Sequence, residues 1–218
     1  MPLFVHCEGS NCRVKIVGDL TEDVSVELGE RLDESLGYYH SRTCTFEINS
    51  PGGSVAALEY ILDCMDKWRK KGIHFGTHAI LQASSAAALL TAFGDVGLRT
   101  AWESSVLLFH ESRAYTASSR PITANDAKTI MDNLKQINEK LILRLTGHVL
   151  SGLKRLPEKD LRERCLEFQK IARKLGETPK ERILQGKCLA RIYGKLFSGE
   201  RSVTPMEAQG LLLLDRTT

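Results

Sequence analysis

The chain has 218 residues, of which 42% are apolar and 26% are charged, and its formal net charge is +3. These values are ordinary for a globular protein, exclude intrinsic disorder, and fit a single domain with a substantial core. So small a net charge also argues against a polyanionic partner.

The first residues contain no basic region followed by an apolar stretch, so we expect no secretory signal. The longest apolar segment, 79–93, is too short to span a bilayer. We therefore expect a cytoplasmic protein that does not contact a membrane. His6 with its neighbouring cysteines could ligate zinc, but no second cysteine pair follows at ligand spacing, and we expect no metal. In the cytoplasm the cysteines should be reduced thiols, at Cys7, Cys12, Cys44, Cys64, Cys165 and Cys188.

Short strands alternate with amphipathic helices through the first half of the chain. Alternating or continuous apolar residues predict strands at 13–17, 43–49, 73–80, 96–100 and 105–109. Apolar residues at helical spacing predict helices at 24–37, 54–71 and 86–93, each ending at or next to a glycine. This order predicts an α/β fold with a largely parallel sheet.

The second half is mostly helical. Polar residues predict a loop at 111–121, and a long helix follows at 123–145, capped by Thr123 and ended by Gly147. Further helices are expected at 158–175, 180–197 and 204–209, and a last strand at 211–214.

The section from Lys154 to Arg201 differs from the rest in charge, with fourteen basic residues against seven acidic ones. Such a section could bind an acidic partner. However, basic residues interleaved with glutamate at helical spacing are typical of a solvated helix face. Without interleaved aromatic residues, nucleic-acid binding is not expected.

The loop Pro51-Gly52-Gly53 lies between a predicted strand and a predicted helix. Glycine N–H groups at a helix start can point at an anion, which is what an oxyanion hole requires. A plain strand-to-helix turn is the alternative.

Two serines, Ser84 and Ser85, occupy the next strand-to-helix junction. Serine is a preferred helix cap, but Ser85 could also be a nucleophile whose following N–H, on Ala86, is an oxyanion donor. His110 ends an apolar strand and could accept the serine proton, or could be structural. These groups lie at the carboxyl ends of strands, where open α/β sheets gather their sites.

Three blocks carry a family resemblance. The octapeptide INSPGGSV at 48–55, the sequence Gln-Ala-x-Ser at 82–85, and the strand ending in His110 resemble the signature blocks of the Clp protease proteolytic subunit family. The likeness covers 13–147 and resumes at 204–215. It implies a crotonase-type, ClpP-like α/β fold of stacked ββα units.

The resemblance also implies how the chain is divided. It predicts one ClpP-like domain over 1–218, with the family core at 13–150 and 200–215. The residues at about 154–199 would then be a basic helical insertion. The helix at 123–145 resembles the element that joins the family's rings, so a homo-oligomer is implied.

In chemical terms the resemblance implies a serine endopeptidase that acts on peptides or unfolded proteins without a cofactor. Ser85 would be the nucleophile, His110 the general base, and the N–H groups of Gly53 and Ala86 the oxyanion hole, which leaves Ser84 as a cap or filler. An unfoldase ATPase is a further implied partner, although the short segment before the first predicted strand argues against it.

The triad acid is less well marked. Residues 158–160 resemble the family block that contains the aspartate, which favours Asp160. Matching backward from Thr204 instead places Leu196 there, with Glu200 nearby, and a Ser–His pair without an acid is a third alternative.

Departures from the family pattern favour a second interpretation. Where the family commonly has glycine before the glutamine and Met-Gly after the serine, this chain has Leu81 and Ala86-Ala87. A noncatalytic scaffold or interaction subunit is therefore the main alternative. Acyl-CoA chemistry on the same oxyanion architecture is another, but it does not need a Ser–His pair.

Overall fold

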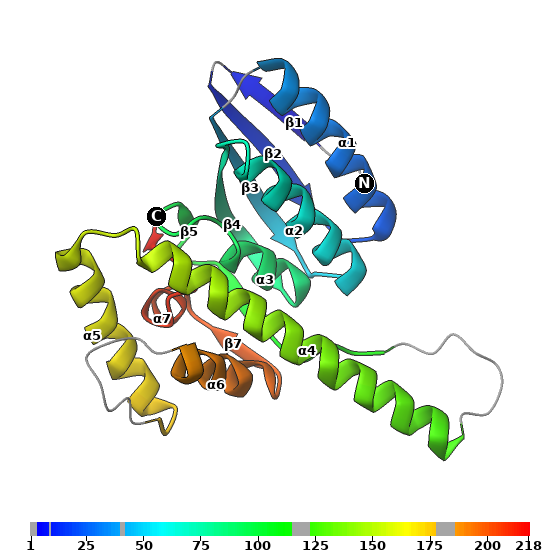
Figure 1. Cartoon of the computed structure of the whole chain (residues 1–218), viewed down its shortest axis with the longest axis vertical. Coiled ribbons are helices and arrows are strands. Elements are labelled where there is room, and N and C mark those ends of the chain that lie inside the picture. The colour runs from blue at the N-terminus through cyan, green and yellow to red at the C-terminus, as the bar shows by residue number, and fades with distance from the viewer. Residues whose placement is uncertain (1–3, 9, 40–41, 115–122, 178–185) are drawn as a thin grey trace.

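The protein is described from a computed structural model that covers residues 4–8, 10–39, 42–114, 123–177 and 186–218 (Figure 1). Within these residues eight strands form one sheet, in the order β1-β2-β3-β4-β5-β8, with β6 beside β4 and β7 beside β6. The strands are β1 (Phe4–Glu8), β2 (Asn11–Val17), β3 (Thr43–Ser50), β4 (His74–Ser84), β5 (Arg99–Ala101), β6 (Val106–Phe109), β7 (Arg201–Val203) and β8 (Arg216–Thr217). The helices are α1 (Glu22–Tyr39), α2 (Val55–Arg69), α3 (Ala86–Ala92), α4 (Ala124–Leu153), α5 (Glu158–Lys174), α6 (Gly186–Phe197) and α7 (Pro205–Gly210).

Most of the sheet is parallel, which confirms the predicted α/β class with a largely parallel sheet. Strands β2, β3, β4, β5 and β8 are parallel neighbours, and β6 runs parallel to the last part of β4. Among the described strands, only β1 and β7 are antiparallel to their partners. Because parallel strands need a crossover connection, helices α1, α2 and α3 return the chain between them.

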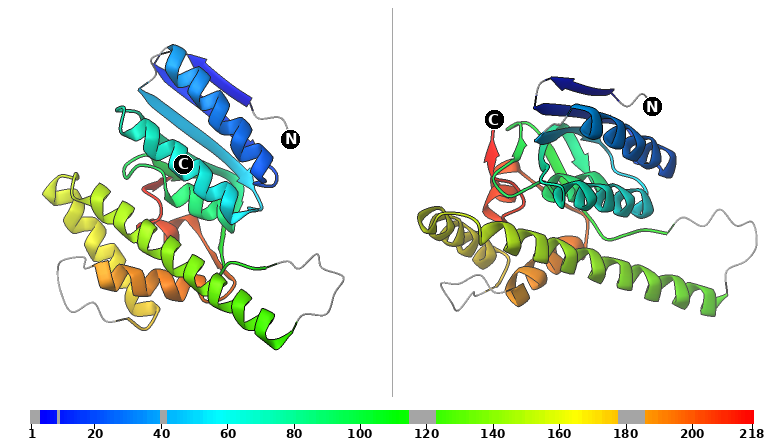
Figure 2. Two further views of the ribbon diagram at one scale, coloured as in Figure 1. Left: turned by 45° about the vertical axis from the view of Figure 1, so that its right-hand side comes forward. Right: turned by 45° about the horizontal axis from the view of Figure 1, so that its top comes forward.

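Helices α1 and α2 lie side by side over one face of the sheet (Figures 1 and 2). The inward residues of β2 and β3 are fully buried beneath them, whereas Arg13 and Lys15 on the opposite face of β2 are exposed and pair with Glu47. Alternation in these strands therefore has the period of two that a half-buried sheet requires.

Helix α4 runs between this α/β half and the group formed by α5, α6 and α7 (Figures 1 and 2). Thr123 caps it, as predicted, and forms a capping box with Asp126. The expectation that Gly147 ends the helix is wrong, because α4 continues to Leu153. Continuing buries Val149 and Leu153 in the core, which outweighs the low helix propensity of one glycine.

The first strand and its disulfide were not predicted. β1 forms a hairpin with β2, in which Cys7 lies directly opposite Cys12 with their Cα atoms 4.1 Å apart and their sulfur atoms bonded. The expectation of reduced thiols is therefore wrong for this pair, because hairpin pairing brings the two side chains together. None of the other four cysteines, Cys44, Cys64, Cys165 and Cys188, forms a disulfide among the described residues, as expected.

The apolar run 211–214 is not the predicted last strand. It forms the buried turn after α7, and Leu212 has a positive φ of 63°. Its carbonyl groups are paired with side chains instead of a sheet: Tyr193 donates to the Leu211 oxygen and Arg99 to the Leu212 oxygen. The last strand is β8, two residues further on.

A buried ion pair holds this C-terminal segment to the sheet. The guanidinium of Arg99 donates to both carboxylate oxygens of Asp215, at 3.0 and 2.9 Å, and Arg164 of α5 also contacts this carboxylate. Burial disfavours the charged carboxylate, but the charge and hydrogen bonds of Arg99 prevail and lower the pKa of Asp215 to about 2. Arg164 is thus one link between the basic section and the core.

Helices α5 and α6 lie where the sequence predicts them, except that 178–185 and the loop residues 115–121 fall outside the described residues. Among the helices that are described, none combines the length and apolar character needed to cross a membrane.

Candidate active site

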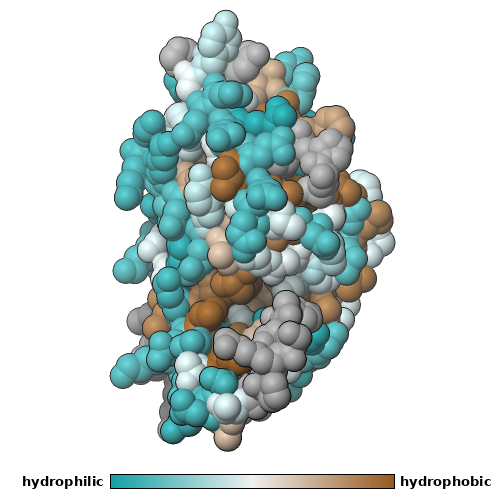
Figure 3. Space-filling model, turned by 90° about the vertical axis from the view of Figure 1, so that its right-hand side faces the viewer, coloured by the Kyte–Doolittle hydropathy of each residue, from teal (hydrophilic) through white to brown (hydrophobic). Residues whose placement is uncertain are grey.

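A cavity of about 750 Å³ opens at the carboxyl ends of β3, β4 and β6. Its lining includes four of the residues predicted for catalysis, Gly53, Ser85, Ala86 and His110. Figure 3 views the molecule from the side toward which α4 projects and shows apolar side chains gathered in a hollow of this face. Sequence blocks far apart in the chain therefore meet at one place.

Ser85 forms a sharp turn between β4 and α3, with φ 55° and ψ −125°. A positive φ in a residue other than glycine costs about 1–3 kcal/mol and is kept only where the surroundings enforce it. Here the Ser85 N–H donates to the Leu108 carbonyl at 2.7 Å, which pins the turn to β6. The side chain of Ser85 makes no capping hydrogen bond, so the capping interpretation does not explain this serine.

Ser84 is not a helix cap either. It is the last residue of β4, it is buried, and its hydroxyl accepts a hydrogen bond from the Gln82 side chain at 2.9 Å. The prediction that Ser84 fills space is consistent with this position, and the prediction that it caps the helix is wrong.

The two glycines of the loop pack against backbone and leave no room for side chains. A Cβ at Gly52 would lie 2.5 Å from the Ser84 oxygen, and a Cβ at Gly53 would lie 2.2 Å from the Leu20 oxygen. Their φ angles are 100° and 151°. Glycine is therefore required at both positions on steric and conformational grounds.

Hydrogen bonds leave one N–H of this loop available. The Gly52 N–H donates to the Ser50 hydroxyl at 3.0 Å, while the Gly53 N–H has no partner among the described residues. Ala86 is the first residue of α3, so its N–H has no acceptor within the helix. Both unused donors border the cavity, as an oxyanion hole requires.

His110 follows β6 directly, and its Nδ1 lies 2.6 Å from the Glu111 carbonyl oxygen. A carbonyl only accepts, so Nδ1 donates to it, and in the neutral form of the ring Nε2 has a free lone pair. Leu108 is the register partner of Ser84, so the strand ends that carry Ser85 and His110 are neighbours, as predicted. Within the described residues the two side chains are not hydrogen-bonded to each other.

Neither predicted carboxylate is hydrogen-bonded to His110 in the described part of the chain. Asp160 is exposed in the first turn of α5 and does not line the cavity. Glu200 accepts a hydrogen bond at 2.8 Å from Arg113, which does line it. The structure thus brings together the serine, the histidine and the donors, but not Asp160.

Sequence reasoning missed the part of α4 that closes the cavity. Leu134, Ile137 and Leu141 line it together with Asn138, and Phe197 joins them from α6. In the sequence, the apolar spacing in α4 indicates a buried face, but it does not distinguish a cavity wall from an assembly surface. These side chains form an apolar wall of the cavity.

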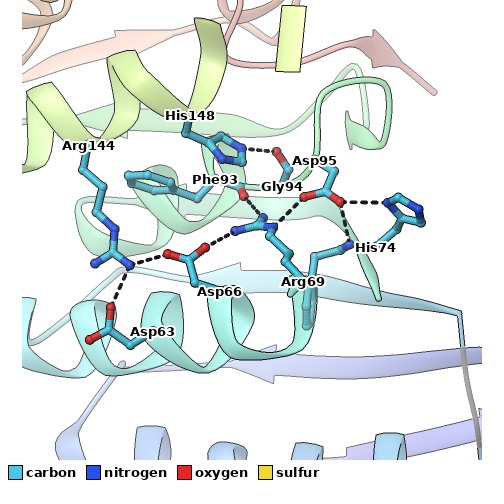
Figure 4. Close-up of polar contacts among 10 residues, drawn as sticks. Asp63, Asp66, Arg69, His74, Phe93, Gly94, Asp95, Arg144 and His148 are labelled. Atoms are coloured by element: carbon cyan, nitrogen blue, oxygen red, sulfur yellow. Dashed lines mark hydrogen bonds and ion pairs between the residues drawn. The ribbon is translucent and has the colours of Figure 1, made fainter. Parts of the chain in front are cut away.

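A second polar cluster lies away from this cavity, where α4 packs on α2 (Figure 4). Arg69 bridges Asp66 and Asp95, and Arg144 of α4 contacts Asp63 and Asp66, with all nitrogen–oxygen distances between 2.7 and 2.9 Å. These pairs tie the helix to the sheet half of the molecule.

His148 lies beside this cluster, and its Nε2 donates to the Gly94 carbonyl at 2.8 Å. Burial, together with the positive charges of Arg69 and Arg99, lowers the pKa of His148 to about 4. The residue is therefore neutral at physiological pH. In the part of the chain that is described, no group of three or more His, Cys, Asp or Glu residues could hold a metal.

A serine on a strained turn, a histidine whose Nδ1 faces a carbonyl, and two N–H donors without a partner among the described residues lie around one cavity. These are the groups that acyl-transfer hydrolases use. The sequence profile of the Clp protease family matches residues 15–173, which is more than half of the chain. The chain belongs to the Clp protease family.

The sequence identity to individual relatives is low. The chain is 34% identical over 119 residues to the ATP-dependent Clp protease proteolytic subunit 3 of Frankia casuarinae, covering 55% of this chain and 54% of the relative. It is 37% identical over 123 residues to subunit 1 of Thermobifida fusca, covering 55% and 52%. A proteolytic subunit of Pleurastrum terricola is 25% identical over 155 residues, covering 71% and 77%. The chain thus spans about half the length of the first two relatives.

Proposed function

We propose that this protein is a serine-type peptidase that hydrolyses peptide bonds in peptides or unfolded proteins. The observation that supports this most is that Ser85, His110 and the N–H groups of Gly53 and Ala86 line one cavity at the ends of three strands. The names of the relatives, which are proteolytic subunits, support the substrate class.

In the proposed mechanism, Nε2 of His110 accepts the proton of the Ser85 hydroxyl while Oγ attacks the carbonyl carbon of the substrate. The N–H groups of Gly53 and Ala86 donate to the oxyanion that forms. His110 then gives its proton to the leaving amine. Water, deprotonated by the same nitrogen, releases the acyl group and regenerates the serine.

The proposal includes the finer features of fold and assembly. We assign the chain a single ClpP-like domain of the crotonase type with stacked ββα units, in which 13–150 and 200–215 are the core and about 154–199 are an insertion. A homo-oligomer assembled through α4 is part of the proposal, as is an unfoldase ATPase partner, since the relatives are named ATP-dependent. The cytoplasmic location stays a prediction from the sequence.

Labelling with a fluorophosphonate, read by intact mass, tests the proposal. Wild-type protein should gain one adduct, Ser85→Ala should gain none, and Ser84→Ala is the matched control that should label like wild type. An unlabelled, assembled wild-type protein would contradict the peptidase proposal. Labelling that survives in Ser85→Ala would remove this serine from the nucleophile's role.

Substitution also separates the predictions for the acid. If Asp160 orients His110, Asp160→Asn should slow labelling at least a hundredfold, and the same holds for Glu200→Gln if Glu200 is the acid. Normal rates in both variants would leave a Ser–His pair without a carboxylate.

The second candidate is a noncatalytic subunit that keeps the scaffold. Two observations favour it. Within the described residues, Ser85 and His110 are not hydrogen-bonded to each other, and no carboxylate is hydrogen-bonded to His110. Its expected signature is a protein that sediments as an oligomer yet takes no label and cleaves no peptide.

A further inference from the structure

A general base of this kind needs its Nδ1 proton held, so that the correct tautomer and ring orientation persist through the reaction. We propose that Asn138 of α4 is the positioning residue that does this, by way of the peptide group between Glu111 and Ser112. This inference rests on the proposed peptidase function. The carbonyl of that peptide group takes the position that a triad carboxylate would otherwise have.

Two hydrogen bonds on one peptide group carry the argument. The carbonyl oxygen of Glu111 accepts from Nδ1 of His110 at 2.6 Å. The N–H of Ser112 donates to Oδ1 of Asn138 at 2.9 Å. A C=O and the following N–H belong to one planar unit and point in opposite directions across a trans bond. Fixing the N–H on Asn138 therefore fixes the direction of the carbonyl that faces His110.

Asn138 is held by the helix on which it lies. It is partly buried and lines the cavity, and its neighbours Ile137 and Leu141 pack against the core. The partner of its side chain is a backbone N–H, which needs an oxygen acceptor, so the orientation of the amide is determined. An asparagine that packs on the core can hold a loop residue in place.

The described carboxylates do not fill this role. Glu200 is paired with Arg113, and Asp160 is exposed on α5. Because a neutral carbonyl accepts the proton of Nδ1, the ring is set with Nε2 as base, but the imidazolium formed during reaction gains no full negative charge. We therefore expect a working base that is weaker than one with a buried carboxylate.

Substitution of Asn138 tests the inference on the assembled, full-length protein. Asn138→Leu keeps a similar shape without an acceptor, and kcat for a fluorogenic peptide should fall about tenfold to a hundredfold with KM within about twofold. Asn138→Asp keeps an oxygen at the same reach and should recover kcat to within about fivefold of wild type. The rate of fluorophosphonate labelling should follow kcat in each variant.

Asn133→Leu is the matched control, since Asn133 is exposed on the same helix, and it should leave kcat and labelling unchanged. If Asn138→Leu does not assemble, Asn138→Ala replaces it with the same expectations. Wild-type kinetics in the acceptor-less variant, or equal loss in the Leu and Asp variants, overturns the inference and leaves the peptidase proposal standing. A wild-type protein that neither labels nor cleaves would instead remove the peptidase proposal itself.

Discussion

The two sides of the cavity are built in different ways. On the serine side, Gly52 and Gly53 touch the backbone of the Ser85 turn and of Leu20 so closely that no side chain fits. On the histidine side, two hydrogen bonds through one peptide group connect His110 to Asn138. Ser85 and the neighbouring N–H groups are thus fixed by steric contact, whereas His110 is fixed by two hydrogen bonds through one peptide group.

This difference predicts how stability responds to substitutions on each side of the cavity. Close-packed backbone has no alternative arrangement, so a single added methyl group disturbs the serine side as a whole. A hydrogen-bonded relay can lose one bond at a net cost of about 1 kcal/mol in stability and still fold. Stability measurements should therefore be sensitive to the serine side and activity measurements to both.

The largest expected effect is on the serine side. Gly53→Ala places a Cβ against the Leu20 carbonyl in a strained backbone conformation, so the free energy of unfolding should fall by about 3 kcal/mol or more. Gly147→Ala is the matched control, because this glycine is helical with open space around it, and it should raise stability by up to about 1 kcal/mol. Urea denaturation followed by circular dichroism measures both, and equal stability of the two variants would contradict the steric account.

A smaller effect is expected in the pH dependence of the free energy of unfolding, through His148 of α4. The pKa of His148 is about 4 in the folded chain and near 6.5 in an unfolded one. Below pH 6.5 the unfolded state binds the proton more readily, so the stability present above pH 6.5 should fall by about 2 kcal/mol between pH 7 and pH 5. His148→Gln keeps a donor for Gly94 without titrating, and its stability should change less over this range. Burial also lowers the pKa of His78, and that residue contributes in both proteins.

Relief of backbone strain at Ser85 is a third, still smaller effect. Ser85→Gly removes the conflict between a side chain and the positive φ, so the free energy of unfolding should rise by about 1 kcal/mol while labelling is lost. Ser85→Ala loses labelling too but keeps the strain, so its stability should stay near that of wild type. A glycine variant no more stable than the alanine variant would show that the turn is not strained.

The smallest effect on stability is expected on the histidine side. Asn138→Leu removes one hydrogen bond at the cavity edge, so the free energy of unfolding should change by no more than about 1 kcal/mol. The same variant is expected to lose much of its kcat. If Asn138→Leu lost as much stability as Gly53→Ala, the proposed difference between the two sides of the cavity would be wrong.

The sequence predicts the serine side well. The glycine loop, the turn at Ser85 and the helix start at Ala86 are local features, and local patterns determine them. The meeting of Ser85 and His110 also follows from chain order, since parallel strands bring their carboxyl ends to one edge.

What the sequence does not predict depends on how one segment pairs with another. β1 becomes a strand because β2 offers an edge, and the Cys7–Cys12 bond follows from that pairing. The run 211–214 has the composition of a strand, but Arg99 and Tyr193 take its carbonyl groups, and no local pattern records this. In the sequence, Asn138 is an ordinary polar residue on a predicted helix. Its hydrogen bond with the Ser112 N–H is visible only in the structure.

The contact between Gly52 and the Ser84–Ser85 peptide has a consequence for building chimeras. Segments 50–54 and 82–87 contact each other through backbone atoms at close distances. If only one of them is replaced by the corresponding segment of a relative, the two no longer fit together. The two segments must be transplanted together as a single cassette. The segment from His110 to Ala114 is held by the Asn138 side chain, so it can be exchanged without the serine-side segments if position 138 is changed with it.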